Sequence, residues 1–210
     1  MLLNLIYPNV CGICKRICKE NICIKCKGIL KKIERTKIKK VKNKNFNEMA
    51  YIFKYEGVIR KCLLDYKFNE LGYLYKTFSE IIIKNKKISR FIKKYDIIIP
   101  VPVHKKRKKQ RGYNQTELIA RKVAKELGIT FENNVLLKTK NTKPQSTLNK
   151  EDRMLNAKGV YTVKHEEKIM GKKVLIIDDI YTTGSTLNEC SRVIRTANPA
   201  KIGILTIAKD

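Results

Sequence analysis

With 210 residues, 43% of them apolar, the chain is long enough for one medium domain plus a small module. Its 47 lysines and arginines face 19 acidic residues, and this formal charge of +28 favours a polyanionic partner, nucleic acid or an anionic membrane surface. No apolar run approaches the roughly 20 residues of a membrane span, and the opening MLLNLIYPNV lacks the basic region and cleavage site of a signal peptide. We therefore expect a cytoplasmic protein without a transmembrane segment. Lys outnumbers Arg 37 to 10, so part of the charge reflects a general bias in composition.

Five of the seven cysteines fall within one short stretch near the start of the chain. Two C-x-x-C pairs, Cys11 with Cys14 and Cys23 with Cys26, predict a structural zinc site, because four thiolates form the tetrahedral set that zinc prefers and leave no open position for catalysis. Cys18 belongs to neither pair and is a fifth candidate ligand. Free buried thiols and a redox pair remain as alternatives.

The segment after these cysteines, KGILKKIERTKIKKVKNKNFN, is rich in Lys and poor in large core residues. It predicts a short helix followed by a linker, with a domain boundary near residue 45. We therefore divide the chain into a zinc-binding module with a basic linker, residues 1–45, and a main domain, residues 46–210.

The main domain alternates short apolar segments with segments of helical periodicity. We expect strands in residues 49–57, 95–103, 134–139, 159–163, 172–178 and 201–208, and helices in residues 58–68, 72–87, 114–128 and 185–197. Continuous apolar strands between helices predict a parallel sheet covered on both faces. In such sheets ligands bind beyond the carboxyl ends of the strands.

One of these ends carries the stretch VLIIDDIYTTGST, in which two adjacent carboxylates precede a turn at a helix N-terminus. The unpaired N–H groups of that terminus form an anion site, and Gly184 permits a tight turn. Asp178 and Asp179 can accept hydrogen bonds from sugar hydroxyls or help to hold Mg²⁺. The pattern therefore predicts a ribose 5-phosphate site; an ordinary capped helix would not explain the acids. No GxxxxGK[ST] motif is present, so the turn is not the P-loop of a nucleoside triphosphatase.

This stretch resembles the signature of type I phosphoribosyltransferases, which bind phosphoribosyl pyrophosphate (PRPP) with Mg²⁺. Together with LIYPNVCGIC…CIKC, IIIPVPVHKKRKKQRGYNQTELIAR and KPQSTLNKEDRMLNAKGVY, it is similar to the ComF family over nearly the whole chain, from Leu2 to about Ala208. The resemblance implies an α/β fold with a type I phosphoribosyltransferase-like parallel sheet, helices on both faces and a preceding four-cysteine zinc module. It also implies a role in natural transformation, in which incoming single-stranded DNA enters the cytoplasm.

The resemblance assigns roles to individual residues. Asp178 and Asp179 would face the ribose hydroxyls, and the turn would surround the 5-phosphate. The PRPP-binding residues in full would be Asp178, Asp179, Thr182, Thr183, Gly184, Ser185 and Thr186. The turn at Val103, His104 and Lys105 would lie on the pyrophosphate side, although a lone His after a strand is usually structural. No protein nucleophile is required, and the catalytic candidates are Asp178, Asp179 and Arg153.

Two further segments carry functional hypotheses. Residues 105–115 combine six cations with an aromatic residue, as in channels for single-stranded DNA, although such a run is also typical of a solvated basic loop. The nucleic-acid candidates are Lys106, Arg107, Lys108, Lys109, Arg111 and Tyr113. Residues 138–153 resemble the loop that closes over PRPP in the wider superfamily, with Gln145 and Arg153 as its functional side chains.

Two main functions stay open at this point. The chain is either an enzyme that transfers phosphoribosyl from PRPP to an acceptor, or a DNA-uptake accessory protein that meets single-stranded DNA through its basic face and binds PRPP as a regulatory or structural ligand. A zinc-dependent RNA-binding protein is a third, weaker interpretation. The family context also implies a helicase-like DNA translocase as a partner.

Overall fold

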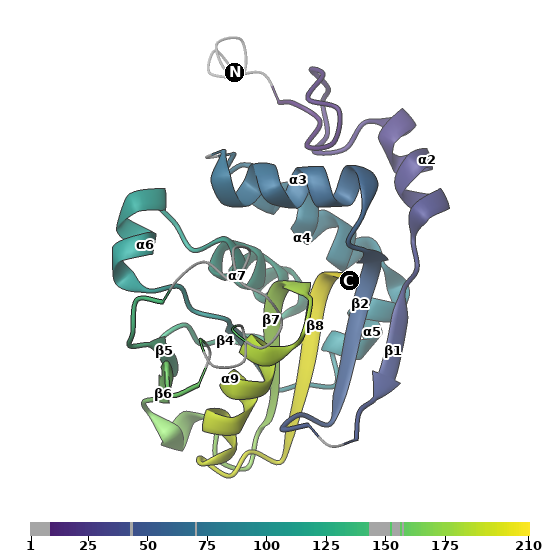
Figure 1. The fold of residues 1–210 in the computed structure, drawn as a ribbon. Coiled ribbons are helices and arrows are strands. Elements are labelled where there is room, and N and C mark those ends of the chain that lie inside the picture. Colours follow the sequence, from purple (N-terminus) through teal and green to yellow (C-terminus); the bar gives the residue numbers. More distant parts are fainter. Residues whose placement is uncertain (1–8, 43, 70, 143–151, 153–155, 157) are drawn as a thin grey trace.

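The computed structural model describes residues 9–42, 44–69, 71–142, 152, 156 and 158–210, which form a central sheet flanked by helices (Figure 1). The helices are α2 (Ile24–Ile33), α3 (Gly57–Phe68), α4 (Leu74–Lys84), α5 (Lys86–Ile92), α6 (Lys105–Arg111), α7 (Gln115–Leu127), the 3₁₀ turn η2 (Glu166–Lys168) and α9 (Ser185–Arg195). The strands are β1 (Lys37–Lys40), β2 (Glu48–Lys54), β3 (Ile97–Pro100), β4 (Thr130–Phe131), β5 (Leu136–Lys138), β6 (Tyr161–Val163), β7 (Lys173–Tyr181) and β8 (Lys201–Lys209).

The main sheet has the strand order β1-β2-β8-β7-β3-β4. Every pairing is parallel except that of β1 with β2, and β7 lies between β8 and β3 near the middle. Neighbouring residues of β7 point to opposite faces: Leu175 and Ile177 join one core, whereas Val174 and Ile176 join the other. A strand buried on both faces needs apolar side chains at every position, which explains its continuous apolar sequence.

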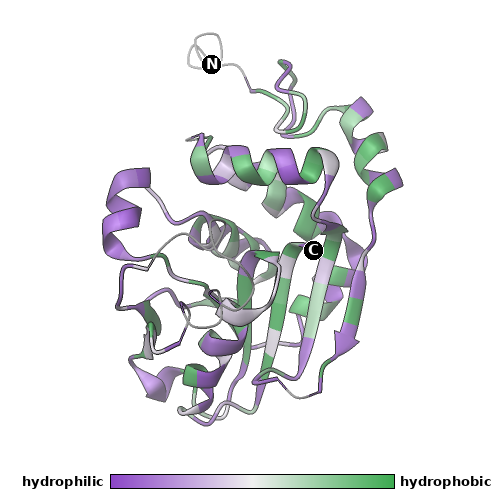
Figure 2. Cartoon of the chain, in the orientation of Figure 1, coloured by the Kyte–Doolittle hydropathy of each residue, from purple (hydrophilic) through white to green (hydrophobic). Residues whose placement is uncertain are grey.

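Helices α3, α4, α5 and α7 pack on one face of the sheet through buried residues that include Leu63, Phe78, Phe91 and Val123. On the other face, α9 and the β5–β6 pair contribute Leu187, Ile194 and Leu136 among others to the second core. The apolar strands lie between these layers (Figure 2). The predicted α/β fold class, a parallel sheet with helices on both faces, is therefore confirmed.

Several local features differ from the expectations. The helix expected over residues 72–87 is divided into α4 and α5, and strand β4 was not predicted. The segment predicted as a linker contains β1, so part of it extends the main sheet as an antiparallel edge strand. Strands β5 and β6 exist as predicted, but in the described part of the chain they pair with each other, antiparallel, and not with the main sheet. The basic segment that starts at Lys105 is a helix, α6, instead of a turn or a loop.

The four-cysteine segment packs above α3 and α4 in Figure 1. Cys11, Cys26 and Leu30 are buried in the same core as the helices on this face of the sheet. Gly12 lies so close to α4 that a Cβ atom there would approach Thr77 Oγ1 to 2.1 Å, so only glycine fits. The module is therefore docked on the main domain.

Among the described residues, no helix combines the length and the apolar composition needed to cross a membrane.

Candidate functional site

The first candidate site is the cysteine cluster. The Sγ atoms of Cys11, Cys14, Cys23 and Cys26 all lie within 4.8 Å of one another, and those of Cys14 and Cys23 are 3.8 Å apart. A tetrahedral zinc–thiolate site with Zn–S bonds of about 2.3 Å places its sulfur atoms about 3.8 Å apart. The four residues therefore fit a metal such as zinc, and a closed thiolate set of this kind serves structure.

Protonation within the cluster is uneven. Burial opposes ionisation of Cys11, but the backbone N–H groups of Cys14 and Cys23 lower the pKa of its thiol. Burial raises the pKa of Cys26. Cys18 lies outside the cluster, and its thiol donates to the carbonyl oxygen of Glu20 at 2.8 Å. The pairs identified by their spacing thus converge, and the fifth cysteine does not join them.

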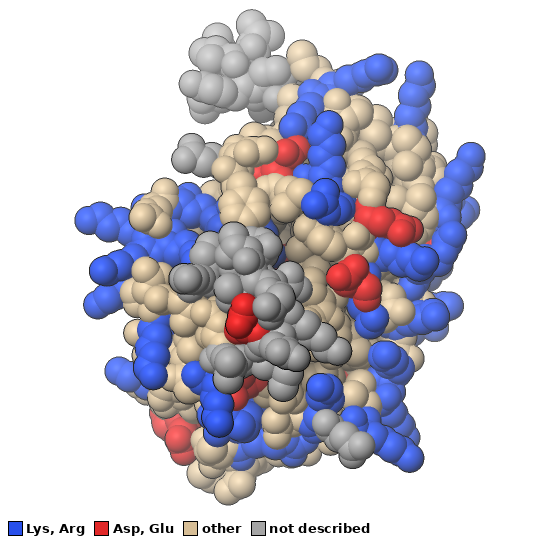
Figure 3. Space-filling view, in the orientation of Figure 1, with Lys and Arg blue, Asp and Glu red and all other residues tan. Residues whose placement is uncertain are grey.

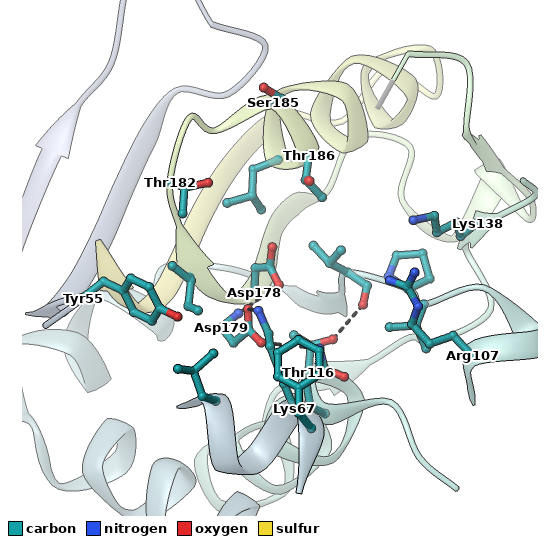
Figure 4. Close-up of a pocket in the computed structure, with 18 of the residues that line it drawn as sticks. Tyr55, Lys67, Arg107, Thr116, Lys138, Asp178, Asp179, Thr182, Ser185 and Thr186 are labelled. Carbon is teal, nitrogen blue, oxygen red and sulfur yellow. Dashed lines mark hydrogen bonds and ion pairs between the residues drawn. The ribbon is translucent and has the colours of Figure 1, made fainter. Parts of the chain in front are cut away.

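The second candidate site is a cavity of about 560 Å³ at the carboxyl ends of β3 and β7. Its walls come from α3, α6, α7, the β5–β6 pair and the N-terminus of α9. In Figure 4, Asp178 and Asp179 lie near its centre, with Tyr55 on one side and Arg107 and Lys138 on the other. Segments far apart in the sequence therefore meet at one cavity.

The two carboxylates have different surroundings. Asp179 is 2% exposed; its Oδ1 lies 2.9 Å from Nζ of Lys67 on α3, and its Oδ2 accepts a hydrogen bond from Nε2 of Gln115 at 3.4 Å. Asp178 accepts from the backbone N–H of Asp179 at 2.9 Å. Burial, followed by the neighbouring charge of Asp179, raises the pKa of Asp178 well above its usual 3.8. Asp178 therefore holds a proton more readily than an isolated carboxyl group does.

The turn between β7 and α9 has the geometry of an anion site. Gly184 caps α9 with φ of 76°, and a Cβ atom there would lie 2.3 Å from the hydroxyl of Tyr181, so glycine is required. The backbone N–H groups of the first turn of α9 lie beside the cavity. Of the predicted phosphate-binding residues, Thr182, Gly184, Ser185 and Thr186 line the cavity. Thr183 instead forms a 2.8 Å hydrogen bond with the hydroxyl of Ser185.

Two basic side chains, those of Arg107 and Lys138, form the wall of the cavity that faces Asp178 and Asp179. Arg107 lies on α6, where its guanidinium donates to the carbonyl oxygen of Thr142 at 3.1 Å. Lys138 on β5 lies with its Nζ 5.7 Å from the ring centroid of Tyr161, and burial lowers the pKa of this lysine. Both side chains face the aspartates across the cavity in Figure 4. An anion bound between them and the acids would gain two positive partners.

The residues predicted for the pyrophosphate side lie in three different settings. Val103 lines the cavity. His104 is 8% exposed and caps α6, where its Nδ1 accepts from the backbone N–H of Lys106 at 3.3 Å. Lys105 is exposed and lies outside the cavity lining. Arg107 and Lys138 supply the cationic wall instead.

The predicted nucleic-acid segment divides into two groups. Arg107 and Arg111 line the cavity. Lys106, Lys108 and Lys109 of α6 are exposed, and Lys108 pairs with Glu117 of α7 at 2.8 Å. Basic side chains gather at this edge of the molecule and also along the edge formed by α2 and β1 (Figure 3).

Tyr113, proposed as a stacking platform, packs within the protein. Its ring stacks on that of Tyr66 at a centroid distance of 5.7 Å, and its hydroxyl donates to the carbonyl oxygen of Tyr66 at 2.8 Å. The ring is therefore already part of an aromatic pair.

We did not predict Lys67, Gln115 or Lys138 as site residues. Lys67 and Lys138 look like the other lysines of a lysine-rich chain, and only the fold brings them to the cavity. Gln115 begins α7, which follows α6 in the chain, and no motif in the sequence marks it as a site residue. Gln145 and Arg153 lie outside the described residues.

Comparison with known proteins agrees with this architecture. The family model for the phosphoribosyl transferase domain matches residues 115–210. "Competence protein F" of Haemophilus influenzae is 28% identical over 79% of this chain and 74% of its own length. "Competence protein ComFC" of Bacillus subtilis is 25% identical over 99% of this chain and 81% of its own length.

A second group of relatives carries a different name. "DNA utilization protein YhgH" of Escherichia coli O157:H7 is 27% identical over 54% of this chain, and the match spans about half of that protein, 49%. The match to the competence protein of Bacillus subtilis covers the cysteine cluster as well as the cavity, since it spans nearly the whole chain.

Proposed function

We propose that the chain, which is similar to proteins named for competence, is a phosphoribosyltransferase-like protein of the ComF family and binds PRPP with Mg²⁺ in the cavity at the carboxyl end of β7. The observation that carries this proposal is the juxtaposition of two carboxylates and a helix N-terminus in one cavity. In the proposed mode, the 5-phosphate meets the turn that begins α9, and Asp178 and Asp179 accept from the ribose hydroxyls.

The cationic wall completes this mode. Arg107 and Lys138 lie across the cavity from the acids, where they would contact the pyrophosphate group. Mg²⁺, when bound, would neutralise pyrophosphate charge, and the oxygens of Asp178 fit its preference for oxygen ligands. Electrostatic stabilisation of this kind would also serve transfer of the phosphoribosyl group, since it favours departure of pyrophosphate.

We further propose that the protein handles incoming single-stranded DNA during natural transformation. Its relatives are named for competence and for DNA utilization, and its charge of +28 favours a polyanionic partner. The exposed lysines of α6 lie beside the cavity and provide one basic surface for such a strand. PRPP then serves either as the donor of a phosphoribosyl group or as a ligand that regulates the DNA-handling protein.

Calorimetric titration of Mg²⁺ and PRPP into the zinc-loaded protein tests the site. We expect saturable binding that is lost in Asp178→Asn/Asp179→Asn and retained in Glu126→Gln, a control on the exposed face of α7. Absence of binding to the unmodified protein would contradict the proposal. Release of pyrophosphate on addition of candidate bases or single-stranded DNA would then separate a transferase from a regulated accessory protein.

A further inference from the structure

We propose that the four-cysteine module, residues 9–33, positions Lys67 at the cavity through helix α3, so that docking of the module sets the affinity of the cavity for PRPP. This inference rests on the proposed PRPP site. It adds a positioning role for residues of the four-cysteine module, which lie outside that site. Three consecutive residues of α3 carry the argument, because each contacts a different part of the molecule.

The first contact joins α3 to the module. Oδ2 of Asp65 lies 2.8 Å from Nζ of Lys15, and Asp65 is only 7% exposed. Lys15 directly follows the zinc-ligand candidate Cys14 and adopts a positive φ of 63°, so the cysteine turn fixes where its side chain starts. One turn earlier on α3, the thiol of Cys62 lies 3.7 Å from the carbonyl oxygen of Gly12.

The second contact fixes the rotation of α3 about its axis. Tyr66 is fully buried, and its hydroxyl donates to the carbonyl oxygen of Gln115 at 2.8 Å. Its ring packs against Phe78 of α4 and Tyr113. Consecutive residues of an α-helix point about 100° apart, so Asp65 and Lys67 point to nearly opposite sides of α3, and Tyr66 points between them into the core.

The third contact lies in the cavity. Nζ of Lys67 is 2.9 Å from Oδ1 of Asp179, and the neighbouring α3 residues Leu64 and Phe68 line the same cavity. Lys67 is the positive partner of a carboxylate that is itself buried, so a shift of α3 changes the charge balance at the proposed ribose site. The ion pair at Asp65 and the ion pair at Lys67 are therefore two ends of one rigid element.

The test separates docking of the module from metal binding. Lys15→Gln and Asp65→Asn each remove the ion pair and leave all four cysteines in place. The swap Lys15→Glu/Asp65→Lys rebuilds a pair of reversed sign. Lys122→Gln, which removes the exposed ion pair with Glu126, is the matched control. For each zinc-loaded protein we would measure zinc content, the affinity for Mg²⁺ and PRPP, and the rate at which an amine-acylating reagent modifies Lys67, followed by mass spectrometry.

We expect both single variants to keep their zinc, to expose Lys67 to faster acylation and to bind PRPP about fivefold more weakly or worse, with partial recovery in the swap. Wild-type affinity and an unchanged acylation rate in both single variants would overturn the inference. The acylation rate does not depend on PRPP. If the wild-type protein fails to bind PRPP while Lys67 still becomes more reactive in the variants, the proposed function fails and the positioning role stands.

Discussion

The cysteine cluster and the cavity are built in opposite ways. All four candidate zinc ligands come from a single stretch of 16 residues, whereas the cavity takes its walls from helices and strands spread between Tyr55 and Asp210. The cluster therefore depends on local spacing and one metal, and the cavity depends on the packing of the whole domain. Substitution of a cluster cysteine should therefore abolish metal binding altogether. Substitutions in the cavity should instead weaken stability or ligand binding by degrees.

The largest effect is expected where one ligand supports a local structure. Cys26→Ser should abolish metal binding and lower the free energy of unfolding by about 5 kcal/mol, because metal binding and folding of such a module are coupled. Cys18→Ser should retain the metal and nearly all of the stability, since this thiol lies outside the cluster. Metal analysis and chemical denaturation measure both; equal losses in the two variants would mean that the cluster does not hold the metal.

In the cavity, the largest effect should come from the ion pair between α3 and β7. Lys67→Met leaves the carboxylate of Asp179 buried beside Asp178 and should lower the free energy of unfolding by about 2 kcal/mol. Adding Asp179→Asn should recover most of this loss, which a double-mutant cycle in urea would measure. Additive losses would show that the two side chains do not interact.

A smaller effect should depend on pH. The folded protein holds the proton of Asp178 more tightly than the unfolded chain does, since burial and Asp179 raise the pKa of this carboxyl group above 3.8. Its contribution to stability is therefore present below the usual pKa and is lost as the pH rises toward the raised value. Asp178→Asn cannot ionise, so between about pH 5 and pH 6 it should gain about 1.4 kcal/mol relative to the unmodified protein. A difference in unfolding free energy that stays constant over this range would contradict the assignment.

The smallest effect concerns α6, which borders the cavity on one side and faces solvent on the other. Lys106→Gln should reduce the salt dependence of single-stranded DNA binding by about 0.7 in the slope of log K against log salt. Lys108→Gln should change it less, because Lys108 already pairs with Glu117. Fluorescence anisotropy at several salt concentrations measures the slopes. Identical slopes in the unmodified protein and both variants would show that this surface does not bind single-stranded DNA.

The same contrast explains how much could be predicted from the sequence. The cysteine pairs and the stretch from Asp178 to Thr186 carry their chemistry in adjacent residues, so spacing alone identified the cluster and most of the turn that lines the cavity. The apolar strands predicted the sheet, because burial on both faces leaves a continuous apolar run. Thr183 was the exception in the turn, since its hydroxyl bonds to Ser185.

The other site residues and two of the strand pairings could be identified only from the folded structure. Lys67 and Lys138 belong to segments without a motif, and tertiary packing alone selects them from 37 lysines. Strand β1, with the sequence KIKK, has no buried residue and therefore no apolar pattern; it is a strand only because its backbone pairs with β2. The antiparallel pairing of β5 with β6 depends in the same way on a partner that the local sequence does not specify.

Strand β1 also has a consequence for experiments on isolated fragments. It covers the edge of β2, whose residues are mostly buried, and it presents three lysines at the outer edge of the sheet. Charged edge strands of this kind hinder the edge-to-edge association that leads to aggregation. A fragment cut at the expected boundary near residue 45 would lose β1 and open the edge of β2 to other chains. Fragments of the main domain should therefore start before Lys37, so that the sheet keeps its charged edge.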